Sequence, residues 1–396
     1  MTRTRASWGR AAVVALVLLV AVTGCGPRPS TSSGSIPAST PASTPTSTSA
    51  TTPEPVGSPF PAAAKINTFL TGLAQRGQLS GTVLLARDGY RFVRAYGLAD
   101  RATGAPNTAG TMFRIGSVTK QFTAMAVLLL QQQHRLDVTD RVCSYLDDCP
   151  PSWASITIGQ LLTHSSGIPD YLNELGLGWP PLAATPAELV AEFRDAPLNF
   201  APGTRMRYSN SGYALLGYLI ERLTADTYAH FLQHHIFDPL AMRHTGFDTT
   251  EVRPGHAVGY YANGQPPTPY PMSAAYSAGA LYSTAADMQR WDDALQHNTL
   301  LPPAAMQQMF AVHIPCPPPA SPGGCLLPTD LGYGYGWFVA HEPQGTLEHH
   351  VGHIDGYFSF NGIYPASHLH IIVLSNSETT DTLTIARTLA AIVHRG

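Results

Sequence analysis

Residues 113–120 read Phe113-Arg114-Ile115-Gly116-Ser117-Val118-Thr119-Lys120, and they lead into the apolar run Phe122 to Leu130. The run predicts a helix that begins near Ser117, and a spacing of three residues puts the serine and the lysine on one face of it. Free N–H groups at such a helix start can face a developing oxyanion. Taken alone, the motif is equally compatible with a helix cap followed by a solvated lysine.

Lys120 is one of only two lysines, the other being Lys65, whereas the chain has 21 arginines. Arginine keeps its proton at any working pH, but an amine that loses its charge in a dry site can take a proton from a hydroxyl. A sequence in which nearly every cation is arginine has a lysine here, beside a serine. We therefore interpret Ser117 as a candidate nucleophile and Lys120 as its candidate activating residue.

Strand patterns lie at both ends of the folded part, and helical patterns fill its middle. A helix from Ala62 to Gln75 precedes two strand-like runs, Gly81 to Ala86 and Tyr90 to Tyr96, which flank the hairpin signal Asp88-Gly89. We predict an α+β fold with one antiparallel sheet built from both termini and flanked by helices, into which a mostly helical lobe is inserted at roughly residues 135–280. The other expected elements are the strands Tyr333 to Ala340, Gly356 to Tyr364 and His368 to Leu374, and the helices Ser117 to Gln133, Thr157 to His164, Thr185 to Asp195, Ser209 to Thr224, Thr227 to Leu240, Thr284 to Gln296 and Asp381 to His394.

The first 24 residues have the organisation of an export signal. Three arginines precede the apolar run Ala11 to Val22, which is too short for a bilayer span of about 20 residues. Val22-Thr23-Gly24-Cys25 resembles the bacterial lipobox, whose cysteine carries lipid; an ordinary secretory signal is the alternative. Residues 25–61 are mostly Ser, Thr, Pro and Ala and are expected to form a disordered tether. We expect an exported chain, lipid-anchored through Cys25 to the outer face of the cytoplasmic membrane, with a folded domain at residues 62–396.

Charge and cysteine content agree with that location. Without the three arginines of the signal, 20 basic residues remain against 26 acidic ones, so no basic surface for nucleic acid is expected. Apart from Cys25, the four cysteines are an even number in an oxidising compartment. Of the three possible pairings, the short spacings favour Cys143 with Cys149 and Cys316 with Cys325.

A second motif, Tyr208-Ser209-Asn210, directly precedes the apolar helix pattern Tyr213 to Leu223. If these residues are extended where they enter the helix, Tyr208 and Asn210 point the same way while Ser209 turns aside to cap it. That arrangement would place a phenol and an amide in one cleft. The alternative is an ordinary helix cap preceded by a core aromatic residue.

A third motif is His349-His350-Val351-Gly352-His353. Clustered histidines suggest a metal, but the chain has no His-Glu-x-x-His motif and no separate acidic ligand motif, so no metal site is expected. The start of a surface strand is the alternative. Gly352 would let a backbone approach a ligand closely.

The order of these motifs resembles the beta-lactamase-related superfamily of serine hydrolases, which includes class C beta-lactamases, DD-peptidases of the actinomycete type and esterases. The resemblance extends over roughly Ile66 to Val393. It includes stretches without catalytic duty, Ile158 to Pro169 and Tyr276 to Thr284. It implies a beta-lactamase/DD-peptidase-like fold and acyl-enzyme chemistry without a metal or organic cofactor.

By this resemblance, Ser117 would be the acylated nucleophile and Lys120 its activating partner. Tyr208 would be the general base, alone or with Lys120, and would later protonate the leaving group. The motif is Tyr-Ser-Asn rather than the Ser-Asp-Asn of class A enzymes, so their separate glutamate is not expected. Backbone N–H groups of Ser117 and His353 would form the oxyanion hole, with His353 following the His-x-Gly triplet on an edge strand.

On the substrate side, the resemblance implies that Asn210 holds the acyl-side amide and that His350 replaces the lysine of the more common Lys-Thr-Gly, followed by Gly352. Relatives that bind a free carboxylate usually have Thr or Ser where this chain has Val351. Without that hydroxyl, one hydrogen bond to the substrate carboxylate is lost. Leaving a buried group without its hydrogen-bond partner costs about 1–3 kcal/mol of binding free energy. Arg205 or Arg207 could bind the carboxylate as a cation in place of that hydroxyl. The simpler interpretation is that both arginines are exposed on the surface.

We therefore expect a serine hydrolase that acts on peptide, amide or ester substrates at the cell surface. Its partners would be a small molecule or a peptide, such as one derived from the cell wall, with no nucleic acid and with membrane contact through the lipid only. One alternative is a beta-lactamase that hydrolyses beta-lactams. Another is a catalytically silent binding lipoprotein with the same fold.

Overall fold

The computed structural model describes residues 60, 62–175, 184–249, 254–317 and 323–395. The predicted signal peptide, the predicted lipidation site Cys25 and the predicted tether up to residue 59 lie outside these residues. Among the described residues, no helix is both long and apolar enough to span a bilayer. Phe60 is buried in the same apolar cluster as Ile66 and Leu70, so the folded part begins two residues before the predicted boundary.

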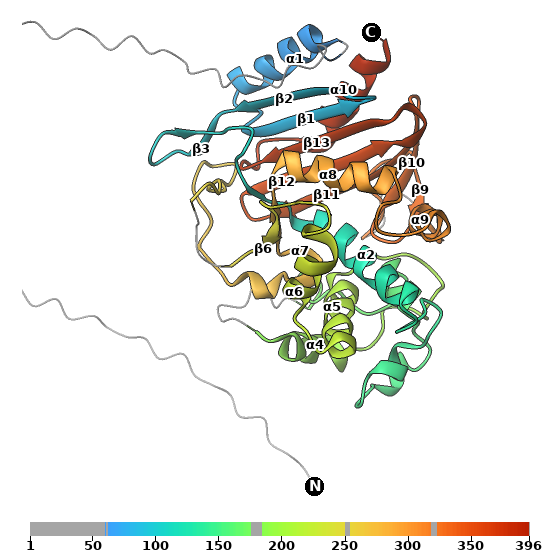
Figure 1. Ribbon diagram of the computed structural model, residues 1–396. Helices are drawn as coiled ribbons and strands as arrows, with labels where there is room; N and C mark the ends of the chain where they lie inside the picture. Colours follow the sequence, from blue (N-terminus) through green and yellow to red (C-terminus); the bar gives the residue numbers. More distant parts are fainter. Residues whose placement is uncertain (1–59, 61, 176–183, 250–253, 318–322, 396) are drawn as a thin grey trace, which may run out of the picture. The chain divides into compact units, whose positions relative to one another are not determined.

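One large antiparallel sheet is built from both ends of the chain, as predicted (Figure 1). Its strand order is β2-β1-β13-β12-β11-β10-β9-β8, so the first strands of the domain pair with the last one. Asp88 and Gly89 both have positive φ, 48° and 82°, in the predicted hairpin turn. The strands are β1 (Gly81–Arg87), β2 (Tyr90–Tyr96), β8 (Ile314–Pro315), β9 (Asp330–Tyr333), β10 (Phe338–Glu342), β11 (Gly345–Ile354), β12 (Tyr357–Tyr364) and β13 (Leu369–Ser375).

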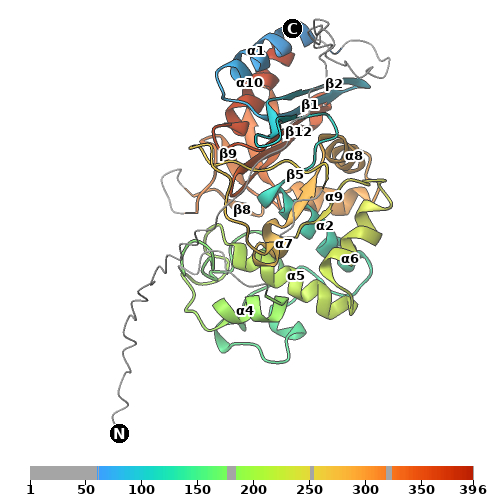
Figure 2. The ribbon, with the colours of Figure 1, turned by 90° about the vertical axis from the view of Figure 1, so that its left-hand side faces the viewer.

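Helices cover both faces of this sheet (Figures 1 and 2). Every residue of β13 is buried, as expected of a central strand with two covered faces. Helices α1 (Ala63–Gln75) and α10 (Thr382–Arg395) pack against one face of the sheet and share a single apolar cluster with it. On the other face, α8 (Ala285–Gln296) contacts β1 and β13, and α2 (Thr119–Gln132) continues into the helical lobe. The segment that contains Ser117, which leads into α2 and is called the nucleophile segment below, therefore lies between the sheet and the lobe.

The inserted lobe is mostly helical, as predicted. Two of its helices begin with capping boxes, Thr157 with Gln160 and Thr185 with Glu188, which satisfy free N–H groups of the first turn. The lobe contains α3 (Ile158–Leu162), α4 (Pro186–Arg194), α5 (Asn210–Thr224), α6 (Tyr228–Leu232), which continues into the π-helix η4 (Gln233–Phe237), and α7 (Tyr276–Gly279). Helix α9 (Pro303–Phe310) follows α8; shorter elements are η1 (Gly116–Val118), η2 (Val142–Tyr145), η3 (Pro151–Trp153), η5 (Met272–Ala274), η6 (Pro365–Ser367), β3 (Leu98–Asp100), β4 (Ala105–Pro106), β5 (Phe113–Arg114), β6 (Gly246–Phe247) and β7 (Leu281–Ser283).

Two strand predictions were wrong in detail. The expected strand Tyr333 to Ala340 is two strands, β9 and β10, because Gly336 has φ of +83° and turns the chain between them. The third motif lies on β11, which is an interior strand of the sheet and not an edge strand. However, β11 pairs with β10 only as far as His349, so residues 350–354 have one open edge.

Candidate active site

The nucleophile segment is pressed against that open edge. Ser117 lies in η1, one turn before α2, and Gly116 has φ of +50°. A Cβ atom at Gly116 would lie 2.9 Å from the backbone N of His353, and one at Gly352 would lie 1.9 Å from the carbonyl O of Ile115. Glycine is therefore required on both sides of this contact, which brings the first and third motifs together.

Lys120 reaches back to Ser117 and is completely buried. Its Nζ lies 3.0 Å from Ser117 Oγ, 2.9 Å from Asn210 Oδ1 and 2.8 Å from the carbonyl O of Ala278. Both carbonyl oxygens can only accept hydrogen bonds, whereas the hydroxyl can also donate one. In a neutral amine, the two N–H bonds therefore go to Asn210 and Ala278, and the lone pair faces the hydroxyl of Ser117.

The environment of Lys120 favours that neutral form. Burial lowers its pKa from the usual 10.5 to about 7, and the nearby carboxylate of Asp170 opposes this shift. Near neutral pH a substantial fraction of the amine is unprotonated. The burial of Lys120 excludes the alternative interpretation, a solvent-exposed lysine on a helix.

Tyr208 joins the same group from the start of α5. Its hydroxyl hydrogen-bonds to Ser117, and its ring centroid lies 4.7 Å from Lys120 Nζ. Burial raises the pKa of Tyr208 well above 10, an effect larger than the opposing one of the bond to Ser117. The resting phenol is protonated, so it is better suited to giving a proton than to taking the first one.

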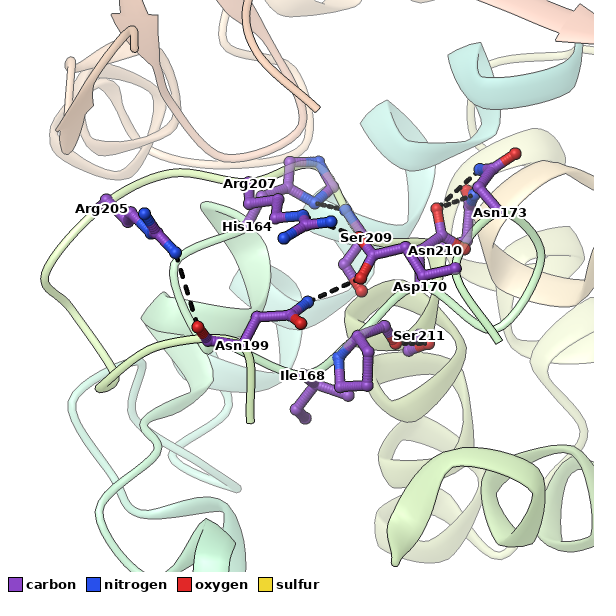
Figure 3. A network of polar contacts seen from close by, with 12 residues as sticks. His164, Ile168, Asp170, Asn173, Asn199, Arg205, Arg207, Ser209, Asn210 and Ser211 are labelled. Atoms are coloured by element: carbon purple, nitrogen blue, oxygen red, sulfur yellow. Dashed lines mark hydrogen bonds and ion pairs between the residues drawn. The ribbon is translucent and has the colours of Figure 1, made fainter. Parts of the chain in front are cut away.

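His164 binds the two neighbours of Tyr208 in the chain, Arg207 and Ser209, and was missed as a site residue (Figure 3). Its carbonyl O accepts from the N–H of Arg207 at 2.9 Å, and its Nδ1 accepts from the N–H of Ser209 at 3.1 Å. Its ring also packs on Tyr208, with centroids 4.2 Å apart. Because Nδ1 accepts and burial holds the pKa of His164 well below its usual value, the neutral ring carries its proton on Nε2.

Ser209 does not cap α5 as predicted. Its backbone is extended, with φ of −145°, but its side chain makes no cap hydrogen bond. The buried Oγ has no hydrogen-bond partner among the described residues. The N–H of Ser209 is bound by His164, which holds the entry to the helix instead.

Asp170 fixes the orientation of Asn210, and sequence reasoning missed it as well (Figure 3). The buried carboxylate accepts from Asn210 Nδ2 at 3.0 Å and from Asn173 Nδ2 at 2.8 Å. This contact turns Asn210 Oδ1 toward Lys120, so a chain of hydrogen bonds runs from Asp170 to Ser117. The only sequence signal was an acidic residue directly after the family-like stretch that ends at Pro169.

His350 is buried and neutral. Its Nδ1 lies 2.6 Å from the carbonyl O of Val351, which can only accept, so Nδ1 carries the proton and Nε2 accepts from Tyr333 Oη at 2.9 Å. Burial and the charge of Lys120 hold the pKa of His350 well below its usual value. The position that would hold a lysine in Lys-Thr-Gly therefore contributes no cation here.

The backbone N–H of His353 points to the open edge of β11. In the antiparallel ladder, odd-numbered residues from Gly345 to His349 face β10, and even-numbered ones face β12. Val351 and His353 continue the odd series beyond the end of β10. This places the His353 N–H on the side where Gly116 and Ser117 lie.

These residues surround a pocket of about 430 Å³. Among the described residues that line it there is no lysine or arginine, and Asp355 is the one acidic residue. Arg207 forms an ion pair with Glu174 at 2.8 Å, and Arg205 stacks over the ring of Phe200. Neither arginine is among the lining residues; Arg205 is exposed, as the simpler interpretation expects, whereas Arg207 is half-buried in its ion pair. The lining consists of Ser117, Leu172, Asn173, Tyr208, Asn210, Ala275, Ala278, Gly279, Gly323, Gly324, Leu326, Phe338, His350, Val351, His353, Ile354 and Asp355.

Both predicted disulfides are present, Cys143–Cys149 and Cys316–Cys325. The loop that the second disulfide closes forms part of the pocket wall through Gly323 and Gly324. Gly323 also accepts a hydrogen bond from the N–H of Tyr208 at 2.8 Å. Cys316, Cys325 and Asp330 are the described residues close enough to share a metal ion, but the disulfide occupies both sulfurs.

Removing the second disulfide is expected to lower activity, because the loop that holds the Tyr208 backbone gains freedom. We expect the double variant Cys316→Ser/Cys325→Ser to lose about tenfold in kcat/KM, the effect of roughly one such contact. The control is Cys143→Ser/Cys149→Ser, whose loop does not line the pocket and whose change should lower only Tm. Equal activity of the two variants, measured on one chromogenic ester, would show that the loop closed by Cys316–Cys325 does not position Tyr208.

Comparison with known proteins agrees with this geometry. The family model described as Beta-lactamase matches residues 66–395. The chain belongs to the Beta-lactamase family. PbpX of Bacillus subtilis, classed by name with the penicillin-binding proteins, is 31% identical over 324 residues, which cover 81% of this chain and 75% of PbpX.

Two solved structures of Beta-lactamase-fold proteins extend the comparison. The octameric penicillin-binding protein homologue from Pyrococcus abyssi has a TM-score of 0.73 and 27% identity, covering 84% of this chain and 77% of that one. D-amino acid amidase from Ochrobactrum anthropi SV3, complexed with L-phenylalanine amide, has a TM-score of 0.73 and 25% identity, covering 84% and 97%. The similar proteins thus include both a penicillin-binding homologue and an amidase.

Proposed function

We propose that this member of the Beta-lactamase family is a serine hydrolase that forms an acyl-enzyme on Ser117 and cleaves amides or esters that need no carboxylate anchor. The observation that carries the proposal is the buried Lys120 amine, 3.0 Å from Ser117 Oγ and held by two obligate acceptors. A binding protein without turnover has no need for a desolvated amine aimed at a hydroxyl.

Acylation follows from these contacts. Neutral Lys120 takes the hydroxyl proton of Ser117 while Oγ attacks the substrate carbonyl carbon. The backbone N–H groups of Ser117 and His353 stabilise the oxyanion. Tyr208 then gives its phenolic proton to the leaving nitrogen or oxygen as the bond to the carbonyl carbon breaks, and the Lys120 ammonium restores that proton.

Deacylation reverses these roles with water. The attacking water gives its proton to Lys120, directly or through Tyr208, and its oxygen adds to the acyl carbon. Ser117 Oγ leaves as it regains a proton, which releases the carboxylic acid. Asn210 Nδ2 has a second hydrogen besides the one on Asp170, and we assign it to the acyl-side amide of the substrate.

Three features support substrates without a carboxylate. Val351 lines the pocket but has no hydroxyl, and the buried His350 is neutral. No arginine or lysine is found among the described lining residues. The similarity to D-amino acid amidase, which was solved in complex with an amino acid amide, agrees with this assignment. The similarity to penicillin-binding proteins keeps D-Ala peptides and beta-lactams as alternative substrates.

We further propose that a lipid on Cys25 holds the enzyme at the outer face of the cytoplasmic membrane.

Covalent labelling tests the proposal. The full chain is incubated with a fluorophosphonate or a penicillin, and the adduct is located by mass spectrometry. We expect it on Ser117, with no adduct in Ser117→Ala. Ser209→Ala, which removes a hydroxyl without a hydrogen-bond partner among the described residues, should still be labelled. Folded protein that neither reagent labels would support the silent binding lipoprotein instead.

The role of Val351 can be measured separately. We expect Val351→Thr, which keeps the side-chain shape and adds a hydroxyl, to raise kcat/KM on nitrocefin and on a D-Ala-D-Ala peptide about two- to tenfold, the effect of one hydrogen bond. Val351→Ala, which removes both methyl groups and adds no hydroxyl, is the control for lost apolar contact. Efficient D-Ala release by the unmodified enzyme would contradict our argument from this position.

A further inference from the structure

One carboxylate lies on the pocket wall without a catalytic role, that of Asp355. It occupies the two-residue turn between β11 and β12, two positions after His353. Asp355 Oδ2 accepts a hydrogen bond from Tyr261 Oη at 3.0 Å. Among the described residues no other hydrogen-bond partner is found for this carboxylate, which lines the pocket and so has an oxygen left to bind a ligand there.

The turn that carries Asp355 is fixed from both sides. The N–H of Gly356 donates to Glu378 Oε1 at 3.1 Å, and the carbonyl O of Gly356 accepts from the N–H of Tyr260 at 3.1 Å. A Cβ at Gly356 would lie 2.7 Å from the Tyr260 backbone, so the turn packs tightly on that segment. A carboxylate on such a turn keeps its place, which a specificity contact requires.

The charges around the pocket make Asp355 its distinctive polar feature. Two other carboxylates near the pocket are engaged, Glu378 by the N–H of Gly356 and by His353 Nε2 at 3.3 Å, and Asp170 by Asn210 and Asn173. His350 is neutral, and no cation is found among the described lining residues. A substrate carboxylate would therefore meet only repulsion near Asp355, whereas an ammonium group would find an open partner.

Building on the proposed function, we infer that Asp355 is a specificity residue that binds the free ammonium group of the substrate, so that the enzyme prefers amides and esters of amino acids with an unblocked amine. The α-amino group has an unperturbed pKa of about 7.7–8.0 and is mostly charged near neutral pH. Asp355 follows His353 by two residues, in the turn at the end of β11, so one substrate can contact both the His353 N–H and the Asp355 carboxylate. This contact would leave the reaction at Ser117 unchanged. It would affect only which acyl groups the enzyme accepts.

The experiment compares matched substrates with the full chain. These are the 4-nitroanilides of D- and L-phenylalanine and of D- and L-alanine, each with a free amine and N-acetylated, with 4-nitrophenyl acetate reporting Ser117 chemistry without an amine. We expect kcat/KM to favour the free amine by about tenfold or more, as for a hydrogen bond to a charged group. In Asp355→Asn the ratio should fall about tenfold, and Asp355→Glu should retain most of it.

The control is Asp238→Asn, which removes one negative charge from an exposed position of the helical lobe and should leave the ratio unchanged. An unchanged ratio in folded Asp355→Asn would overturn the inference, as would a preference of the unmodified enzyme for N-acetyl substrates. The latter comparison needs no variant. If the ester is not hydrolysed and Ser117 is not labelled, the proposed function fails; if the ester is hydrolysed without an amine preference, only the role of Asp355 fails.

Discussion

Replacement of Lys120 by arginine is expected to lower kcat/KM by about a thousandfold, within the range of about 10²–10⁴ for removal of a positioned base. Arginine keeps its proton at every working pH, so it cannot take the proton of Ser117. The longer side chain would also have to fit a position with no exposed surface, where Nζ now has three partners. The measurement is steady-state hydrolysis of one amide and one activated ester.

The pH profile carries the same prediction. Because burial lowers the pKa of Lys120 to about 7, the unprotonated and active amine increases as the pH rises through 7. We expect kcat/KM of the unmodified enzyme to increase between pH 6 and 8 with a midpoint near 7, and then to level off. The residual activity of Lys120→Arg should lack this acidic limb. An unchanged limb in that variant would assign it to another group.

The chain supplies its own control for this substitution. Lys65, the only other lysine, lies exposed on α1. Lys65→Arg makes the same chemical change on the surface and should leave both the rate and the pH profile unchanged. Similar losses in the two variants would mean that the effect arises from folding and not from the amine.

The sequence predicted those site residues that belong to short motifs. Ser117 and Lys120 meet because a spacing of three residues is one helical turn, which any α-helix would provide. Tyr208 and Asn210 enter the same pocket because the chain is extended at Ser209 just before α5. Local geometry decides how residues within one motif are placed, so a single sequence is enough to anticipate it. The contact between Lys120 and Asn210 spans 90 residues, and the resemblance in the order of the motifs predicted it.

The residues that position these groups were missed because their contacts join distant parts of the chain. His164 binds the N–H of Ser209 across 45 residues, and Asp170 binds Asn210 across 40. Neither distance follows from a periodicity. The edge position of the third motif was also misjudged, because β8, β9 and β10 extend the sheet beyond β11 while leaving residues 350–354 uncovered.

The part played by Val351 changes in this context. The missing hydroxyl was one reason to doubt carboxylate recognition, worth about one hydrogen bond. The structure adds a neutral His350, two arginines engaged elsewhere and a carboxylate at Asp355. Together these disfavour an anionic substrate by charge rather than by one lost contact, so Val351→Thr alone should recover only part of that activity.

Tyr208→Phe should separate proton donation from nucleophile activation. Burial raises the pKa of the Tyr208 phenol, so it is protonated when the substrate binds and can give that proton to the leaving group. An amide needs this proton because an amine anion is a very poor leaving group, whereas a nitrophenolate leaves without one. We expect kcat on an anilide to fall by about 10²–10⁴-fold and kcat on a nitrophenyl ester to fall far less.

The control for Tyr208→Phe is Tyr213→Phe. Tyr213 is also buried, its ring centroid lies 5.4 Å from Lys120 Nζ, and its hydroxyl donates to the carbonyl O of Leu162. Losing that hydroxyl should cost stability, about 1–3 kcal/mol for an unmatched buried partner, with only a small effect on either rate. If Tyr208→Phe slowed the ester and the anilide equally, the phenol would be needed to activate Ser117, and Lys120 would not be the sole base. If it slowed neither, the leaving-group proton would have to come from Lys120, which also faces Ser117 Oγ.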